Sequence, residues 1–175
     1  DLLLYGMGER PIVEVAAALA GGLPAEHITY VPGTCYMASN LDQVYEYELI
    51  PSYEEVAHNK QKYCDAFMKQ YREQDAIRGK RLVQPHDKGY LVVNPPSMPL
   101  NRQELDDVYD LPYTRKPHPS YKQPIPALQE VEFSLTSCRG CYGGCSFCAL
   151  TFHQGRVVQS RSHASLLREA EILTK

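Results

Sequence analysis

The chain of 175 residues lacks any long hydrophobic run. Its longest apolar stretches, around Leu2 to Tyr5 and Tyr90 to Val93, have the length of a strand, whereas a membrane-spanning helix needs about 20 apolar residues. We therefore expect no membrane span. The sequence also lacks an initiator methionine and a basic segment followed by a hydrophobic one, so we expect no signal peptide and a chain truncated at its front.

A large excess of charge is missing as well. The net charge is -3, which provides no broad attraction to nucleic acid or to an anionic membrane surface. Aromatic and basic residues mix between Tyr113 and Lys122 in a way that could suit stacking on single-stranded RNA. The prolines among and just after them favour a connector that packs its tyrosines on a neighbouring domain. We expect no nucleic-acid partner.

Residues 1–50 show the pattern of an α/β domain. Asp1 to Tyr5 predicts a buried strand, Pro11 begins an amphipathic helix that ends at Gly21, and Ile28 to Val31 predicts the next strand. This β-α-β order predicts the C-terminal part of a parallel α/β domain.

Residues 51–127 are predicted to form a helical and proline-rich connector. Ser52 and Glu55 have the spacing of a capping box, and apolar residues then recur at helical spacing up to Gly79, which predicts one long helix. A short strand is expected at Tyr90 to Val93. Eight of the 13 prolines lie after it, which predicts little regular structure.

Residues 128–175 are predicted to form a strand, a cysteine loop and a helix. Apolar and polar residues alternate from Val131 to Thr136, as in a strand with one buried face. A cysteine loop follows directly, and Ser162 can cap a last helix that continues to the final residue, Lys175.

Four of the six cysteines fall within eleven residues, from Cys138 to Cys148. This crowding favours metal binding over disulfides, and thiolates meant for a metal must stay reduced, which predicts a cytoplasmic protein. Cys141, Cys145 and Cys148 have the spacing Cys-x3-Cys-x2-Cys. A cluster that only transfers electrons takes four thiolates, so three leave one iron open to bind a substrate or cofactor.

Other metal sites fit this spacing less well. A structural zinc site on all four cysteines would have its two pairs only three residues apart, where zinc ribbons place about 15 to 20 between them. Bacterial ferredoxins space their cysteines differently and end in Cys-Pro, whereas Ala149 follows here. A redox dithiol at Cys145 and Cys148 leaves Cys141 unexplained. A non-catalytic module that binds zinc or a four-cysteine iron-sulfur cluster remains the alternative.

The cysteine loop, with aromatic Phe147 just before its last cysteine, resembles the signature loop of the radical S-adenosylmethionine (SAM) superfamily. More narrowly, the chain resembles the YgiQ-type radical SAM proteins over nearly its whole length. The segments that carry this resemblance are Gly6-Met7-Gly8-Glu9, Asn94-Pro95-Pro96, Leu111 to Arg115, His118 to Tyr121, Arg139 to Cys148, His153 to Arg156 and Gln159 to Ser162.

The resemblance implies a fold and a chemistry. Residues 128–175 would be the first β/α unit of a partial TIM-type barrel, truncated, and residues 1–50 the end of a domain like those that bind cobalamin. Cys141, Cys145 and Cys148 would hold a 4Fe-4S cluster whose open iron binds SAM and cleaves it to a 5'-deoxyadenosyl radical. Phe147 would lie beside the adenine.

The resemblance also implies partners. These are SAM, a substrate that it does not identify, and a one-electron reductant such as flavodoxin or ferredoxin. The family's glycine-rich segment for the SAM amino group would lie beyond Lys175, so we expect this chain alone to be inactive. We expect Cys138 to be no cluster ligand but a small residue that faces inward from the predicted strand.

Overall fold

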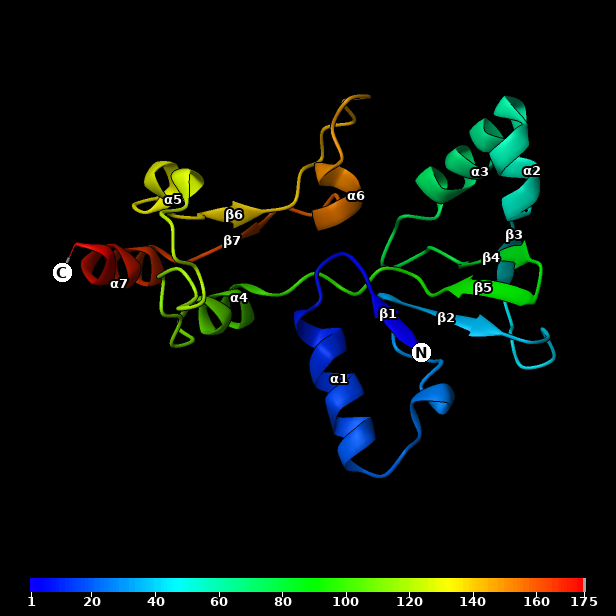
Figure 1. The fold of residues 1–175 in the computed structure, drawn as a ribbon, viewed down its shortest axis with the longest axis horizontal. Helices are drawn as coiled ribbons and strands as arrows, with labels where there is room; N and C mark the ends of the chain where they lie inside the picture. The colour runs from blue at the N-terminus through cyan, green and yellow to red at the C-terminus, as the bar shows by residue number, and fades with distance from the viewer. Residues whose placement is uncertain (175) are drawn as a thin grey trace. The chain divides into compact units, whose positions relative to one another are not determined.

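The computed structural model describes residues 1–174, which form two compact units (Figure 1). Unit 1 consists of Asp1–Pro99 with Gly140–Val157, and unit 2 of Leu100–Arg139 with Val158–Lys175. Lys175, the end of the last predicted segment, lies outside the described residues. The domain boundaries expected near residues 50 and 127 stay a prediction.

Unit 1 is built on a mixed sheet with the strand order β1-β2-β5-β4-β3 (Figure 1). Neighbouring strands are antiparallel except for β3 and β4, which are parallel. The strands are β1 (Leu2–Leu4), β2 (Thr34–Ala38), β3 (Tyr47–Leu49), β4 (Arg81–His86) and β5 (Gly89–Val93). Val83 and Val92 are fully buried in its centre, where they pack with Val44. The strand expected at Tyr90 to Val93 is confirmed as part of β5.

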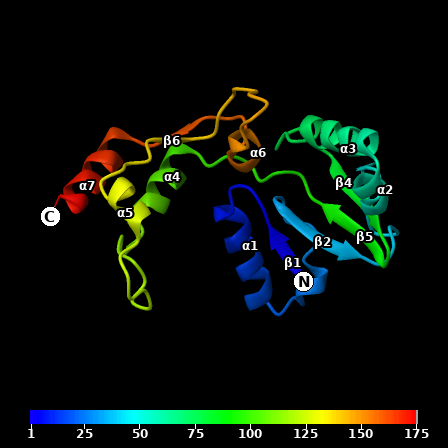
Figure 2. The ribbon, with the colours of Figure 1, turned by 45° about the horizontal axis from the view of Figure 1, so that its top comes forward.

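The helices of unit 1 lie around this sheet (Figure 2). They are α1 (Glu9–Ala20), the 3-10 helix η1 (Ala25–His27), α2 (Tyr53–His58), α3 (Lys60–Arg72) and α6 (Leu150–Gln154). The helix expected from Pro11 to Gly21 is confirmed, because α1 contains Pro11 and is capped by Gly21. Among the described residues, no helix is long and apolar enough to cross a membrane.

The parallel strand pair expected in the first 50 residues is wrong. Ile28 and Val31 are fully buried and pack against Val15 of α1, but they lie in an irregular segment. The chain turns at Gly33, whose φ of 73° favours glycine, and β2 then runs antiparallel to β1. A short apolar run shows that a segment is buried but does not fix its backbone conformation. The pattern therefore located Ile28 and Val31 in the core, while the strand expected there is absent.

The single long helix expected between Ser52 and Gly79 is two helices. The predicted capping box is present: Glu55 N–H donates to Ser52 Oγ at 3.2 Å, and Ser52 N–H donates to Glu55 Oε2 at 2.9 Å. The chain leaves the helical conformation at Asn59, whose side chain accepts from the backbone N–H groups of Gln61 and Lys62. Asparagine is a strong N-cap because it satisfies these otherwise unpaired donors, so it begins α3.

Unit 2 consists of α4 (Arg102–Tyr109), α5 (Pro126–Val131), the short strands β6 (Cys138–Arg139) and β7 (Gln159–Ser160), and α7 (His163–Leu173). Helix α4 lies in the segment where little regular structure was expected. Its signal is a capping box, in which Asn101 and Glu104 exchange hydrogen bonds of 3.0 and 2.7 Å. The cap expected at Ser162 is confirmed, because it accepts from Ser165 N–H at 3.1 Å.

The strand expected from Val131 to Thr136 is also wrong. Pro126 begins α5, which ends at Val131, and the residues up to Ser137 are irregular. Phe133 is 70% exposed, so the apolar face of the pattern does not pack. A strand is stable only when a neighbour satisfies its backbone groups, and within residues 1–174 the first ladder after α5 is the pair β6–β7.

Candidate metal centre

The cysteine loop leaves β6 and leads into α6, and two hydrogen bonds close its base, one between backbone groups and one to the Gln154 side chain. Cys141 N–H donates to Gly155 O at 3.0 Å, and Gly140 N–H donates to Gln154 Oε1 at 3.0 Å. Gly155 ends α6 with a φ of 79°, which a residue with a side chain adopts at a cost. The start of the loop at Gly140 and Cys141 is therefore hydrogen-bonded to its end at Gln154 and Gly155.

Gly143 lies where two of the predicted ligands approach each other. Its N–H donates to Cys141 Sγ at 3.3 Å. A Cβ atom at position 143 would lie 3.2 Å from Cys141 Sγ and 3.9 Å from Cys145 Sγ. Glycine at this position thus gives two sulfurs room around one point of the backbone.

Cys148 follows through a tight turn, in which its N–H donates to Cys145 O at 3.1 Å. Cys145 is exposed, and Cys141 and Cys148 are half-buried. Over residues 1–174 no group of three or more possible metal-ligating side chains is gathered at one point. The soft donor set and the space at Gly143 fit an iron-sulfur cluster, and its binding by these three cysteines stays a prediction.

Phe147 is 90% exposed. It is therefore no core residue of this structure, and its ring is available to a ligand. Tyr142, on the other side of the two glycines, is 84% exposed. The predicted contact of Phe147 with adenine stays a prediction.

The other cysteines have different surroundings. Cys138 lies on β6 opposite Ser160, and its side chain is exposed, so the expectation that it fills an inward-facing position is wrong. It was based on continuing the strand from Val131, which is absent from the described structure. Burial raises the pKa of the Cys35 thiol to about 11, so Cys35 keeps its proton and is a poor metal ligand.

A cavity of about 290 Å³ lies in unit 1 between the sheet, the end of α3 and α6. Phe152 of α6, four residues after Cys148, forms part of its wall, together with Gln74 and Leu91. Gln74 Oε1 is buried without a hydrogen-bond partner. The cavity therefore offers a small organic molecule a mixed apolar and polar wall with one unpaired acceptor, Gln74 Oε1.

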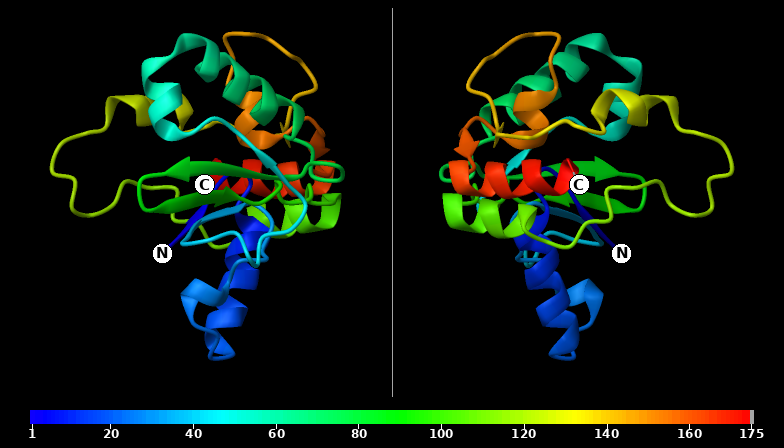
Figure 3. Two further views of the ribbon diagram at one scale, coloured as in Figure 1. Left: turned by 90° about the vertical axis from the view of Figure 1, so that its right-hand side faces the viewer. Right: turned by 90° about the vertical axis from the view of Figure 1, so that its left-hand side faces the viewer.

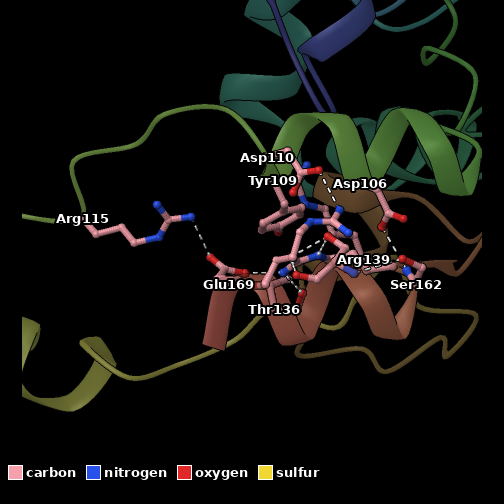
Figure 4. Close-up of polar contacts among 11 residues, drawn as sticks. Asp106, Tyr109, Asp110, Arg115, Thr136, Arg139, Ser162 and Glu169 are labelled. Atoms are coloured by element: carbon pink, nitrogen blue, oxygen red, sulfur yellow. Dashed lines mark hydrogen bonds and ion pairs between the residues drawn. The ribbon is translucent and has the colours of Figure 1, made fainter. Parts of the chain in front are cut away.

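Unit 2 contains a buried arginine that the sequence did not single out. The side chain of Arg161 is completely buried and forms an ion pair with Glu169, which also pairs with Arg115 at 3.3 Å. Arg161 donates to Thr136 O at 3.1 Å and lies 4.0 Å from the centroid of the Tyr109 ring. In Figure 4, Tyr109 of α4 and Glu169 of α7 lie on facing helices, and Arg115 reaches Glu169 from a loop to the side.

Asp106 belongs to the same region. It accepts from Ser162 N–H at 2.9 Å, and hydrogen bonds from Ser162 hold its pKa below the usual range. Asp106 thus links α4 to the residue that caps α7. A sequence signal existed for the cap but not for the carboxylate that binds it, because the two are distant in the chain.

Comparison with known proteins supports the predicted family. The family model described as Radical SAM N-terminal matches residues 1–134, which end just before the cysteine loop. Two UPF0313 proteins from type A strains of Clostridium botulinum are 54% identical over 99% of this chain. One from Clostridium perfringens is 53% identical over 100% of this chain. The chain spans 27% of the length of each of these relatives.

The match over residues 1–134 is independent of the three cysteines, and the identity to UPF0313 proteins continues through them to the end of the chain. The segments quoted for the resemblance lie in both parts. The chain therefore belongs to the Radical SAM N-terminal family, among the YgiQ-type radical SAM proteins.

Proposed function

We propose that the chain is the cluster-binding portion of a radical SAM enzyme. Cys141, Cys145 and Cys148 hold three irons of a 4Fe-4S cluster and leave the fourth to SAM. The observation that carries this proposal is the crowding at Gly143, where a side chain would meet two of the three sulfurs. Family membership supports it independently.

When bound and reduced, such a cluster supplies the electron that cleaves SAM to a 5'-deoxyadenosyl radical. The residues of this chain bind and orient. Gly143 N–H, at 3.3 Å from Cys141 Sγ, stabilises negative charge on that ligand. Phe147, exposed at the end of the loop, offers its ring face to the adenine of SAM.

The proposal extends to the partners. A one-electron reductant such as flavodoxin or ferredoxin would reduce the cluster, and a substrate of unknown class would lose a hydrogen atom. Free thiolates are kept reduced in the cytoplasm, where we place the protein.

The wider fold is also part of the proposal. A partial TIM-type barrel would begin after residue 127 and continue in the regions of the relatives that this chain does not span. The likeness of residues 1–50 to a cobalamin-binding domain was based on a parallel sheet. β1 and β2 are antiparallel, so this support for the likeness is lost. Cobalamin is therefore not among the proposed cofactors.

The test is anaerobic reconstitution of the chain with iron and sulfide. We expect a brown protein with the broad charge-transfer absorption of an iron-sulfur cluster and close to four irons per chain. Adding SAM should change the electron paramagnetic resonance spectrum of the reduced cluster. A colourless protein that holds one zinc ion would instead establish the alternative, a non-catalytic metal-binding module.

A further inference from the structure

Helix α3 presents an aromatic face to the segment that follows the cysteine loop. Phe67 and Tyr71 are four residues apart, so they share one face of the helix, with ring centroids 6.2 Å apart. Both contact Phe152 of α6, at 5.7 and 5.9 Å between centroids, which is within the range in which aromatic rings attract one another. Figure 3 shows α6 beside α3 within unit 1. The three rings join α3 to the residues just after Cys148.

A polar path leads from the end of α3 to the centre of the cysteine loop. Gln74 Nε2 donates to Thr151 O at 3.2 Å. The Thr151 hydroxyl group is buried and donates to Gly143 O at 2.8 Å. Gly143 is the residue whose N–H donates to Cys141 Sγ, and it lies two residues from both Cys141 and Cys145, so the path ends between two predicted ligands.

Tyr71 also contacts the loop directly. A Cβ atom at Gly144 would lie 3.3 Å from the Tyr71 hydroxyl oxygen, so the tyrosine lies against the backbone just before Cys145. At the other end of the loop, the Arg156 guanidinium lies 4.3 Å from the centroid of the same ring. One side chain of α3 thus touches both the middle and the exit of the cysteine loop.

We propose that α3 is an intramolecular docking surface for the cysteine loop, and that Tyr71 and Gln74 are positioning residues for the cluster. The proposal rests on the proposed cluster site and gives the N-terminal region, which the family model matches, a task in that chemistry. A loop already held in its binding shape loses less conformational freedom when it takes up a ligand, so it releases that ligand more slowly. Removing the contacts should therefore accelerate loss of iron without changing the ligands.

The first test uses the reconstituted chain and a strong iron chelator. Tyr71→Leu removes the ring contacts, and Gln74→Ala removes the hydrogen bond to Thr151; each should accelerate iron loss by about fivefold, the effect of one such contact. Tyr71→Phe keeps the ring contacts with Phe152 and Arg156 and loses only the hydroxyl that lies against Gly144, so its rate should lie between those of the unchanged chain and Tyr71→Leu. Tyr63→Leu is the matched control, because Tyr63 lies on the same helix and is 59% exposed.

The second test uses iron-free protein, so that it remains informative if the chain binds no cluster. Amide hydrogen exchange over residues 140–156 should be faster in Tyr71→Leu and Gln74→Ala, while exchange in β4 and β5 stays unchanged. Unchanged exchange in the loop would overturn the docking proposal. Equally faster exchange in the sheet would overturn it too, because Tyr71 would then serve only the stability of unit 1. If the variants show the expected faster exchange in the loop but the chain binds no iron on reconstitution, the docking proposal stands and the proposed cluster is contradicted instead.

Discussion

Two cysteines of the motif, Cys141 and Cys145, differ in surroundings from Cys35 and Cys138. Cys141 and Cys145 have their sulfurs around Gly143, whereas Cys35 is held protonated by burial and Cys138 lies on the β6–β7 pair. The difference predicts which thiols respond to metal.

Replacing Cys141, Cys145 or Cys148 singly by Ala should abolish the cluster, because two thiolates do not hold it against solvent and chelators. Iron and acid-labile sulfide per chain after anaerobic reconstitution measure this. Cys138→Ser is the matched control and should keep the iron content and spectrum of the unchanged chain. Loss of the cluster in Cys138→Ser would show that all four clustered cysteines bind the metal.

A second residue-scale prediction concerns alkaline pH. Burial raises the pKa of Cys35 from its ordinary value of 9.0 to about 11, so the folded state retains a proton that the unfolded chain releases. The stability that this provides is fully present below pH 9 and is lost as the pH rises towards 11. The neighbouring Tyr5, whose pKa is raised mainly by burial, acts in the same direction at higher pH.

Urea unfolding of the iron-free, reduced chain at pH 8, 9 and 10 measures this effect, with a slope of at most about 1.4 kcal/mol per pH unit for one proton. Cys35→Ala should flatten the slope over this range. Cys64→Ala is the control, since Cys64 is exposed on α3. A slope that is equally steep in Cys35→Ala would contradict the assignment.

At the residue scale, the sequence predicted the ligand candidates and the caps at Ser52 and Ser162, whereas the cap at Asn101 and the buried partners were missed. Ser52, Asn101 and Ser162 cap helices through contacts three residues away in the chain, so their pattern is visible in the sequence. Arg161 meets Thr136 and Tyr109, which are distant in the chain. Nothing in a single sequence marks such pairs, and Arg161 was quoted only as part of a resembling segment.

At the scale of elements, the helices α1 and α7 were predicted, whereas two of the four expected strands are absent from the described residues and α4 was missed. The periodicity of α1 and α7 depends on residues a few positions apart, while a strand depends on a partner elsewhere in the chain. The alternation from Val131 to Thr136 has the correct period but leads to no pairing in the described residues, and Leu135 remains 39% exposed. For the same reason, the hydrophobic pattern located Ile28 and Val31 in the core without revealing their backbone conformation.

The buried charges between α4 and α7 lead to a prediction about unit 2. Arg161→Met leaves Glu169 without its buried partner and should lower the free energy of unfolding by about 3–5 kcal/mol, as for other broken buried ion pairs. Hydrogen exchange of the α7 amides measures the change within this unit. The pairing of Arg115 with Glu169 places the effect towards the lower end of that range.

Arg168→Met is the control for this experiment. Arg168 also lies on α7 and pairs with Asp110 at 2.7 Å, but the two side chains are 51% and 44% exposed. Exposed ion pairs contribute only about 0–1 kcal/mol because solvent screens them. Equal effects of the two substitutions would show that burial of Arg161 adds nothing to the strength of its pair.

At the scale of the whole molecule, the mixed α/β class and the radical SAM family were both predicted from the sequence. The class follows from counting apolar patterns, and the family from short segments spread along the chain. The strand order of unit 1 could not be predicted, because it depends on which edges pair across long distances in the chain. The grouping of the cysteine loop with Asp1–Pro99 in unit 1 could not be predicted for the same reason, since it depends on contacts between distant parts of the chain.

The final prediction compares this chain with a complete relative. The chain spans 27% of the UPF0313 proteins that it matches, and the radical SAM resemblance places much of the SAM pocket on later barrel strands. We therefore expect the reconstituted chain, reduced with dithionite, to form 5'-deoxyadenosine at least about a thousandfold more slowly than a full-length relative, because misplacing a reactant by about 1 Å already costs a hundredfold. Both proteins should show the same charge-transfer absorption, so that cluster content is matched before rates are compared. Comparable rates of 5'-deoxyadenosine formation would mean that the residues described here already hold SAM in a reactive position, and the proposed dependence on further strands would be wrong.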